Sequence, residues 1–173
     1  LKDSDNIATN AILLKLGQRF YHRQGTWQNS LRAMKAILAK PTKINFKKNL
    51  INDGAGLSRY NLVSARQVAK LLNFIYHDKL IKKPLLTALP IAGKDGTLEY
   101  RMRFARRTER IIAKTGSMTG VSALAGYVFT KHNGPVSFVI IVNGFVGKRR
   151  PYIRLENKIC RLLLNAKRNP QGA

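Results

Sequence analysis

Acidic residues, cysteine and long apolar runs are all scarce in this sequence. Its 173 residues include eight Asp and Glu and a single cysteine, Cys160. One cysteine excludes an internal disulfide, and no His or Cys stands at metal-ligand spacing from it, so we expect a small buried residue on a helix face. The longest apolar run, Val136 to Val142, has the length of a strand, whereas a membrane-spanning helix needs about 20 apolar residues.

Several patterns of catalytic and ligand-binding sites are missing as well. The sequence has no phosphate-binding Walker loop, and the segment from Gly116 to Gly120 is not a Gly-x-Ser-x-Gly nucleophile elbow. The acids are too dispersed to predict a two-carboxylate glycosidase, although Asp53 and Asp95 remain candidates for such a pair. We expect no metal site and no cofactor. The three histidines are scattered, and we expect them to be ordinary surface or core residues: His22, His77 and His132.

The charge is strongly one-sided, because 32 Lys and Arg give a formal net charge of +24. Such a charge attracts anionic partners at long range, and nucleic acid, anionic lipid and an acidic cell-wall polymer all qualify. The alternative is a generally basic surface without a dedicated partner. The basic residues are spread along the whole chain, without an aromatic RNA-binding signature or zinc-finger spacing, so a nucleic-acid partner rests on charge alone.

Hydrophobic residues make up 45% of the chain, which predicts one globular domain with a real core. Apolar spacing in the first part predicts helices over 6–20 and 27–38, the second ended by Pro41. A third helix is predicted from a Ser64 cap to about Tyr76. A glycine-containing loop precedes that cap, and Pro84 and Pro90 are expected to interrupt the stretch after it.

The apolar period then changes to that of strands. We predict three strands and a closing amphipathic helix, over 110–114, 121–131, 136–143 and 153–166. The third strand is expected to be buried, residues 93–97 to form a turn, and 98–110 an exposed helix or hairpin. The predicted fold class is α/β of the α+β type, an antiparallel sheet covered by helices plus a helical layer. Residues 1–92 are then the mainly helical part and 93–173 the sheet part.

Lys114-Thr115-Gly116 follows an apolar run and precedes Ser117, so we expect it to end an edge strand. A glycine there leaves the strand edge open to a pairing substrate. The lysine supplies positive potential for a substrate carboxylate, and Thr115 and Ser117 can donate hydrogen bonds to it. The alternative interpretation is a strand-end turn with a solvated lysine.

Ser4-Asp5-Asn6 lies at the start of the chain. All three residue types are good helix N-caps, so the alternative to a catalytic role is a cap by Asp5 or Asn6. The two interpretations are compatible. A cap fixes the loop, and Ser4 and Asn6 then point the same way in extended backbone.

Together these are two of the three motifs of the penicillin-recognising serine acyl-enzymes. The third, Ser-x-x-Lys, supplies the nucleophile and is absent, because none of the seven serines has a lysine three residues later. The sequence resembles the D-alanyl-D-alanine carboxypeptidase/endopeptidase family of class C penicillin-binding proteins. The resemblance rests on five segments in this order: Ser-Asp-Asn, Asp-Gly-Ala-Gly-Leu-Ser-Arg at 53–59, Asp95-Gly96-Thr97, Lys-Thr-Gly-Ser and 120–127. The resemblance covers nearly the whole chain. We expect the C-terminal part of a transpeptidase-like domain, with the attacking serine upstream.

The resemblance implies a serine-type D-Ala-D-Ala carboxypeptidase/endopeptidase that acts on peptidoglycan stem peptides through an acyl-enzyme. It implies a bacterial periplasm or cell envelope as the location, β-lactams as inhibitors, and no activity for this chain alone. Anionic cell-envelope polymers are further partners suggested by the charge. The site residues carried over are three catalytic and three substrate-binding ones: Ser4, Asn6 and Lys114, then Thr115, Gly116 and Ser117.

One departure from the family pattern is Ala55, which stands where the family usually has a serine. The missing hydroxyl is expected to alter hydrogen bonding in that loop. Three alternatives stay open. A serine β-lactamase shares the motifs and fold, a non-catalytic scaffold would keep the fold without the nucleophile, and a nucleic-acid binder would use the charge alone.

Overall fold

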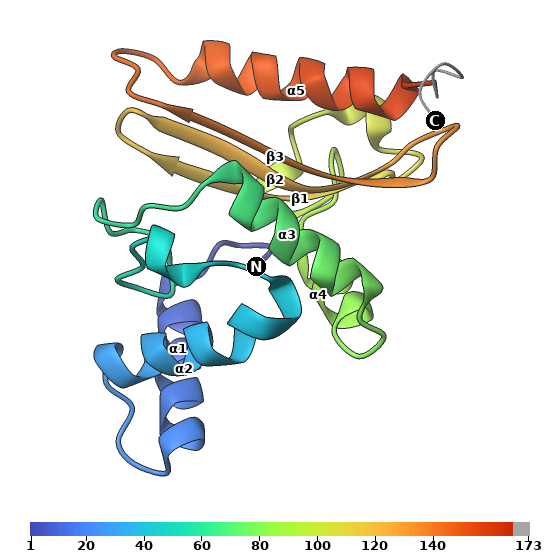
Figure 1. Ribbon diagram of the computed structural model, residues 1–173. Coiled ribbons are helices and arrows are strands. Elements are labelled where there is room, and N and C mark those ends of the chain that lie inside the picture. Colours follow the sequence, from blue (N-terminus) through green and yellow to red (C-terminus); the bar gives the residue numbers. More distant parts are fainter. Residues whose placement is uncertain (168–173) are drawn as a thin grey trace. The chain divides into compact units, whose positions relative to one another are not determined.

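The computed structural model describes residues 1–167, which pack into two compact units. The helical unit is Asp5–His77, and the sheet unit combines Leu1–Ser4 with the chain from Asp78 onward. Figure 1 labels the helices and strands of both. Packing therefore divides the chain differently from the sequence split at residue 92, because the first four residues and the helix after Asp78 belong with the sheet.

Three helices make up most of the helical unit: α1 (Asn6–Tyr21), α2 (Trp27–Thr42) and α3 (Ala65–His77), with a short 3-10 turn, η1, at Phe46–Lys48. Each helix begins at a side-chain cap. The Asp5 carboxylate accepts from the Ala8 N–H at 2.9 Å, which settles which residue of the first motif caps α1. Thr26 forms a capping box before α2, and Ser64 accepts from the backbone of α3 as predicted.

The contact between α1 and α2 depends on a glycine, and part of the apolar side chains of α1 stay exposed. Leu13 and Gly17 are the buried residues of α1, whereas Ile7 and Ile12 are exposed by 83% and 69%. A Cβ on Gly17 would lie 2.1 Å from the Ser30 hydroxyl, so glycine is what lets the two helices approach.

Two prolines do not act as the sequence predicts. Helix α2 continues past Pro41 and ends at Thr42, where Lys43 adopts a left-handed conformation, because a proline in the last turn removes only one late hydrogen bond. Pro84 lies in the first turn of a short helix, α4 (Lys82–Ala88), where its missing N–H has no helical partner to lose. Pro90 does follow the end of that helix.

The sheet has three antiparallel strands in the order β1-β2-β3, spanning Ile111–Met118, Val121–Phe129 and Pro135–Asn143. Strand β1 runs through the Lys-Thr-Gly motif instead of ending at it, since Gly116 pairs with Ala123 and Ser117 with Ser122. The expectation of a buried third strand is also wrong. Strand β3 lies at one edge with only Phe138 buried, and the central strand β2 is the most buried.

Helix α5 (Arg150–Asn165) lies over one face of this sheet and begins three residues earlier than predicted, with a proline in its first turn (Figure 1). Cys160 is fully buried there as expected, and burial raises the pKa of its thiol to about 12.

Residues 98–110 form neither an exposed helix nor a hairpin. They make turns around the 3-10 segment η3 (Arg103–Ala105), with Leu98, Met102 and Ala105 in the core.

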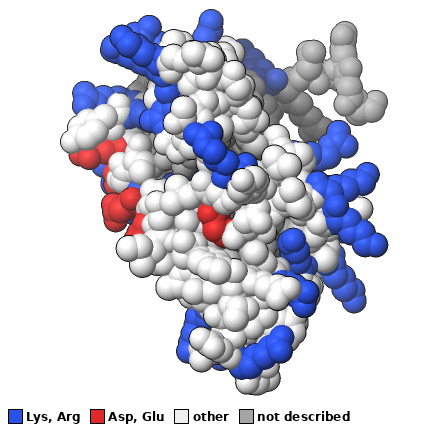
Figure 2. All heavy atoms as spheres, turned by 90° about the vertical axis from the view of Figure 1, so that its left-hand side faces the viewer, with Lys and Arg blue, Asp and Glu red and all other residues white. Residues whose placement is uncertain are grey.

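Lys and Arg side chains are spread over the face drawn in Figure 2, and acids show in only a few places. Within residues 1–167 no helix is long and apolar enough to cross a membrane.

Candidate functional site

Ser4 and Lys114 meet in the sheet unit. The Lys114 Nζ donates to the Ser4 hydroxyl oxygen at 2.7 Å and to the carbonyl of Thr115 at 2.8 Å. Both side chains are half-buried, and burial lowers the pKa of Lys114 because a charged amine loses hydration there. A cation is thus held against a hydroxyl at a site that solvent reaches only in part.

The Asp95-Gly96-Thr97 segment holds the start of the chain that carries Ser4. Lys2 forms an ion pair with Asp95, and the Thr97 N–H donates to the Lys2 carbonyl at 3.1 Å. Gly96 has a φ of +54°, and a Cβ there would lie 2.6 Å from the Lys2 carbonyl oxygen. Only glycine allows this approach, so the Asp95-Gly96-Thr97 segment fixes the start of the chain that leads to Ser4.

Opposing influences set the pKa of Asp95. Burial acts to raise it, but the hydrogen bond from Lys2, the Ile91 N–H and the charges of Lys2 and Lys94 together hold the pKa below its usual value. The carboxylate therefore stays ionised and keeps its hold on Lys2 through the neutral range.

Thr97 is a site residue to which the sequence analysis assigned no role. The Thr115 hydroxyl donates to the Thr97 hydroxyl at 3.0 Å, so two threonines from different motifs stand side by side next to Lys114. The sequence held one hint of this role, because both Asp-Gly-Thr and Lys-Thr-Gly contain a threonine hydroxyl. Sequence alone did not place the two motifs together.

The outer edge of β1 is covered in its first half only. The Ile111 carbonyl accepts from the Ala92 N–H, and the Ala113 N–H donates to the Pro90 carbonyl. Backbone groups of alternate residues face the same edge, so those of Thr115 and Ser117 also point outward. Among the described residues, the Ser117 N–H and carbonyl have no backbone partner on that side.

No contact among the described residues requires a glycine at position 116. Its backbone is not left-handed, and an added Cβ would meet only the Ala123 Cβ at an ordinary 3.4 Å. Gly126, on the neighbouring strand, is different, because a Cβ there would lie 2.2 Å from the Ile112 carbonyl. The space beside Gly116 is therefore open on the face that also carries Lys114.

Asn6 begins α1 and belongs to the helical unit, so Lys114 and Asn6 are described in separate units. Ser4 has a φ of +57°, a left-handed conformation, and not the extended backbone expected to turn Ser4 and Asn6 to one side. That part of the expectation is wrong. Asp5 is extended and acts as the helix cap.

The loop around Ala55 is organised by one carboxylate. Asp53 accepts from the backbone N–H groups of Gly56, Leu57 and Ser58 and from the Asn61 side chain, at 2.7–3.0 Å. Burial acts to raise the pKa of Asp53, but these donors hold it below its usual value. The loop is thus ordered without a hydroxyl at position 55.

A buried ionic network lies behind the motif strand. The Glu156 carboxylate, on α5, has no solvent exposure and accepts from the Ser122 hydroxyl and from Arg101, both at 2.7 Å. Ser122 is the register partner of Ser117. The network therefore ties α5 to the part of the sheet that carries the open edge.

The other candidates do not form a site in the described chain. The three histidines are exposed at separate places, and within residues 1–167 no group of three or more His, Cys, Asp or Glu could hold a metal ion.

Comparison with known proteins identifies relatives over almost the whole chain. The model of the D-Ala-D-Ala carboxypeptidase 3 (S13) family matches residues 1–159. D-alanyl-D-alanine carboxypeptidase DacB of Haemophilus influenzae is 33% identical over 92% of this chain and 35% of its own length. A D-alanyl-D-alanine carboxypeptidase of an Actinomadura species is 35% identical over 85% of this chain and 28% of its own length.

A solved structure gives the same result for the fold. Penicillin-binding protein 4 (dacB) from Haemophilus influenzae, complexed with a novel β-lactam, has a TM-score of 0.83 and 33% identity. The match covers 96% of this chain and 40% of that one. The chain thus spans well under half the length of these relatives, and its fold is that of the corresponding part.

Proposed function

Because the chain belongs to the D-Ala-D-Ala carboxypeptidase 3 (S13) family, we propose that it is the C-terminal part of the active-site domain of a serine-type D-Ala-D-Ala carboxypeptidase/endopeptidase. The observation that carries the proposal is the 2.7 Å contact between the Lys114 Nζ and the Ser4 hydroxyl beside an open strand edge. The attacking serine and its lysine base belong to the longer protein, since no serine here has a lysine three residues later.

The reaction proceeds by acyl transfer. The serine oxygen attacks the carbonyl of the penultimate D-Ala and forms an ester, the peptide bond breaks, and the departing amine takes up a proton. Ser4 is the group that passes this proton, because its hydroxyl touches Lys114. Lys114 orients Ser4 and supplies positive potential. Water then hydrolyses the ester and releases the shortened peptide.

The strand edge positions the substrate. A peptide that pairs with β1 meets the outward N–H of Ser117, which stabilises the developing oxyanion together with the N–H of the attacking serine. Thr115 and Ser117 bind the terminal carboxylate, and Gly116 leaves room for it. Asn6 holds the amide of the acyl side, a role that rests on the family motif alone.

The substrate class is peptidoglycan stem peptides, and β-lactams react as substrate mimics that leave a long-lived ester. The β-lactam complex of the Haemophilus influenzae relative supports this, as do the names of the carboxypeptidases that match. Peptidoglycan lies outside the inner membrane, so the bacterial periplasm or cell envelope is the proposed location.

Intact-mass measurement with benzylpenicillin tests the proposal. The full-length protein should gain the mass of one benzylpenicillin on a serine upstream of Ser4, whereas this 173-residue chain should gain none. Lys114→Ala in the full-length protein should slow adduct formation by about tenfold or more, because it removes an interaction with the reacting groups. An unmodified full-length protein would contradict the proposal and favour a scaffold. Rapid loss of the adduct would indicate a serine β-lactamase.

A further inference from the structure

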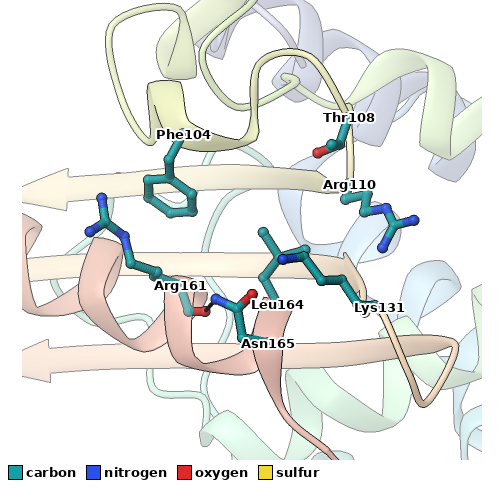
Figure 3. Close-up of a pocket in the computed structure, with 7 residues that line it drawn as sticks. All are labelled: Phe104, Thr108, Arg110, Lys131, Arg161, Leu164 and Asn165. Carbon is teal, nitrogen blue, oxygen red and sulfur yellow. Dashed lines mark hydrogen bonds between the residues drawn. The ribbon is translucent and has the colours of Figure 1, made fainter.

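A concave site lies between α5, the start of β1 and the end of β2, away from Lys114. It has a volume of 280 Å³ and is lined by seven residues: Phe104, Thr108, Arg110, Lys131, Arg161, Leu164 and Asn165. Three of these residues are basic and none is acidic. The three basic residues come from different places: Arg110 just before β1, Lys131 just after β2 and Arg161 on α5 (Figure 3). We call this the basic pocket.

The basic pocket is separate from the Ser4–Lys114 site. Ile111 and Ala113 of β1 pack with Leu164 in the core, on the face that α5 covers. Side chains alternate along a strand, so Lys114 points to the other face. Arg110 is also four residues from Lys114, roughly 13 Å along the strand.

The three cations have no acid of their own. Glu109 is next to Arg110 in sequence, but its carboxylate pairs with Lys94 at 2.5 Å. Glu156 is on the same helix as Arg161, but it is buried against Arg101. Among the described residues, no acid pairs with any of the three basic side chains. Three positive charges around one small hollow repel one another, and a bound anion would relieve that repulsion.

The neutral polar side chains of the basic pocket are already occupied. The Thr108 hydroxyl donates to the Ala105 carbonyl at 3.1 Å, and the Asn165 amide donates to the Arg161 carbonyl at 2.9 Å. The cations are therefore the donors left for a ligand. The Arg161 guanidinium carbon is 4.4 Å from the centre of the Phe104 ring, which fixes it at the rim by a cation–π contact.

The frame of the basic pocket is held by backbone hydrogen bonds. The Lys131 N–H donates to the Leu164 carbonyl at 3.1 Å, and the Phe129 N–H donates to the Arg110 carbonyl at 2.7 Å. Leu164 is buried and lies between Arg161 and Lys131 in Figure 3, whereas Phe104 is 37% exposed beside Arg161; these two residues are the apolar part of the lining. The site thus joins an apolar lining to three cations, with Lys131 between Arg161 and Arg110 in Figure 3.

We propose that the basic pocket binds a phosphate ester. The oxygens of a phosphate accept hydrogen bonds from several directions and carry up to two negative charges, which suits cations that come from three elements better than a single planar carboxylate does. The hollow of 280 Å³ has room for a phosphate with a short alkyl or ring substituent. Arg110, Lys131 and Arg161 bind the phosphate, and its substituent lies on Phe104 and Leu164.

Calorimetric titration of the full-length protein with hexyl phosphate tests this. Lys131→Gln and Arg161→Gln should each weaken binding about tenfold, as expected for the loss of one charge-assisted hydrogen bond. Arg154→Gln is the matched control, because it removes one exposed charge from α5 outside the basic pocket. It should change the affinity less than twofold. None of the three should alter acylation by benzylpenicillin, so the result is independent of the proposed activity.

Further ligands separate the sources of such a group. Tighter binding of hexyl phosphate, a monoester, would indicate a free phosphorylated metabolite. Tighter binding of dibutyl phosphate, a diester, would indicate the phosphodiester of a cell-envelope polymer or lipid. Failure of both to bind would overturn the proposal. So would equal weakening by Arg154→Gln and the two pocket variants, since that would mean attraction to the basic surface as a whole.

Discussion

The ammonium of Lys114 and the hydroxyl of Ser4 lie 2.7 Å apart, although 110 positions separate them in the sequence. The contact depends on two supports. Strand pairing with β2 fixes Lys114, and the Asp95-Gly96-Thr97 segment fixes the stretch that ends at Ser4. Each support can be removed separately, which makes the roles of the two residues testable.

The pH dependence of acylation should report the charge of Lys114. Burial lowers its pKa below 10.5, so the charged form is lost as the pH rises through that lowered value. In the full-length protein we expect the benzylpenicillin acylation rate to decrease as the pH rises, with a midpoint lower than pH 10.5. This alkaline decrease should vanish in Lys114→Arg, because arginine stays charged. The exposed Lys94→Arg is the control. A decrease that persists in Lys114→Arg would assign the titration to another group.

Gly116 and Gly126 should respond in opposite ways to the same substitution. Gly116→Ala places a Cβ in ordinary contact, so the melting temperature should hardly change while acylation falls about tenfold, because the Cβ fills the open space on the face that carries Lys114. Gly126→Ala places a Cβ 2.2 Å from a backbone oxygen and should cost about 3 kcal/mol of stability. Thermal melts and adduct formation measure both. Full activity in Gly116→Ala would show that no substrate backbone approaches there.

Asp95→Asn should loosen the segment that carries Ser4. The ion pair with Lys2 is part-exposed, so its loss should lower the stability by under about 1 kcal/mol. Amide hydrogen exchange of residues 2–4 should nevertheless speed up, and acylation should slow.

The ionised form of Asp95 stabilises the fold above its unfolded pKa of about 3.9, and this contribution is lost as the pH falls through the lowered folded value.

The control for the Asp95→Asn experiment is Asp78→Asn, which alters another carboxylate of the sheet unit that accepts from backbone N–H groups, without touching Lys2. It should leave exchange in residues 2–4 unchanged. Equal acceleration in both variants would mean that the whole sheet unit had been loosened.

Glu156→Ala should be the most destabilising side-chain deletion among the described ion pairs. It strips Arg101 and Ser122 of a fully buried partner, and breaking a buried pair costs about 3–5 kcal/mol. Urea unfolding of the full-length protein measures the loss. Glu109→Ala, which breaks the exposed pair with Lys94, should leave the midpoint unchanged. A small effect of Glu156→Ala would show that the two hydrogen bonds from Arg101 to the Asn157 side chain suffice to hold the arginine.

Local signals predicted much of this fold because they act over a few residues. The Ser64 cap and the period of β1 and β2 are properties of short segments, and the structure contains both. Predictions failed where contacts distant in sequence decide the outcome. Strand β1 continues past Lys114, where the sequence predicted its end, because β2 pairs with it through Met118, and no local pattern reveals that partner.

The candidate site shows the same division. Ser4, Lys114 and Thr115 were found as motif residues, and their geometry followed once the chain was folded. Thr97 was quoted only as part of a pattern, because its partner is 18 positions away. The link from Glu156 to Ser122 was missed altogether, since a lone acid on a basic helix has no sequence signature of burial.

The half-covered edge of β1 also bears on how copies of the protein behave toward each other. Pro90 and Ala92 close the first half, as natural proteins often do, but closing the second half would exclude a substrate that pairs there. An uncovered strand edge invites a strand from another molecule. The formal charge of +24 on this chain opposes that encounter and attracts a small acidic peptide, so under the proposed function the basic surface would favour substrate capture over self-association. High salt would weaken this discrimination first.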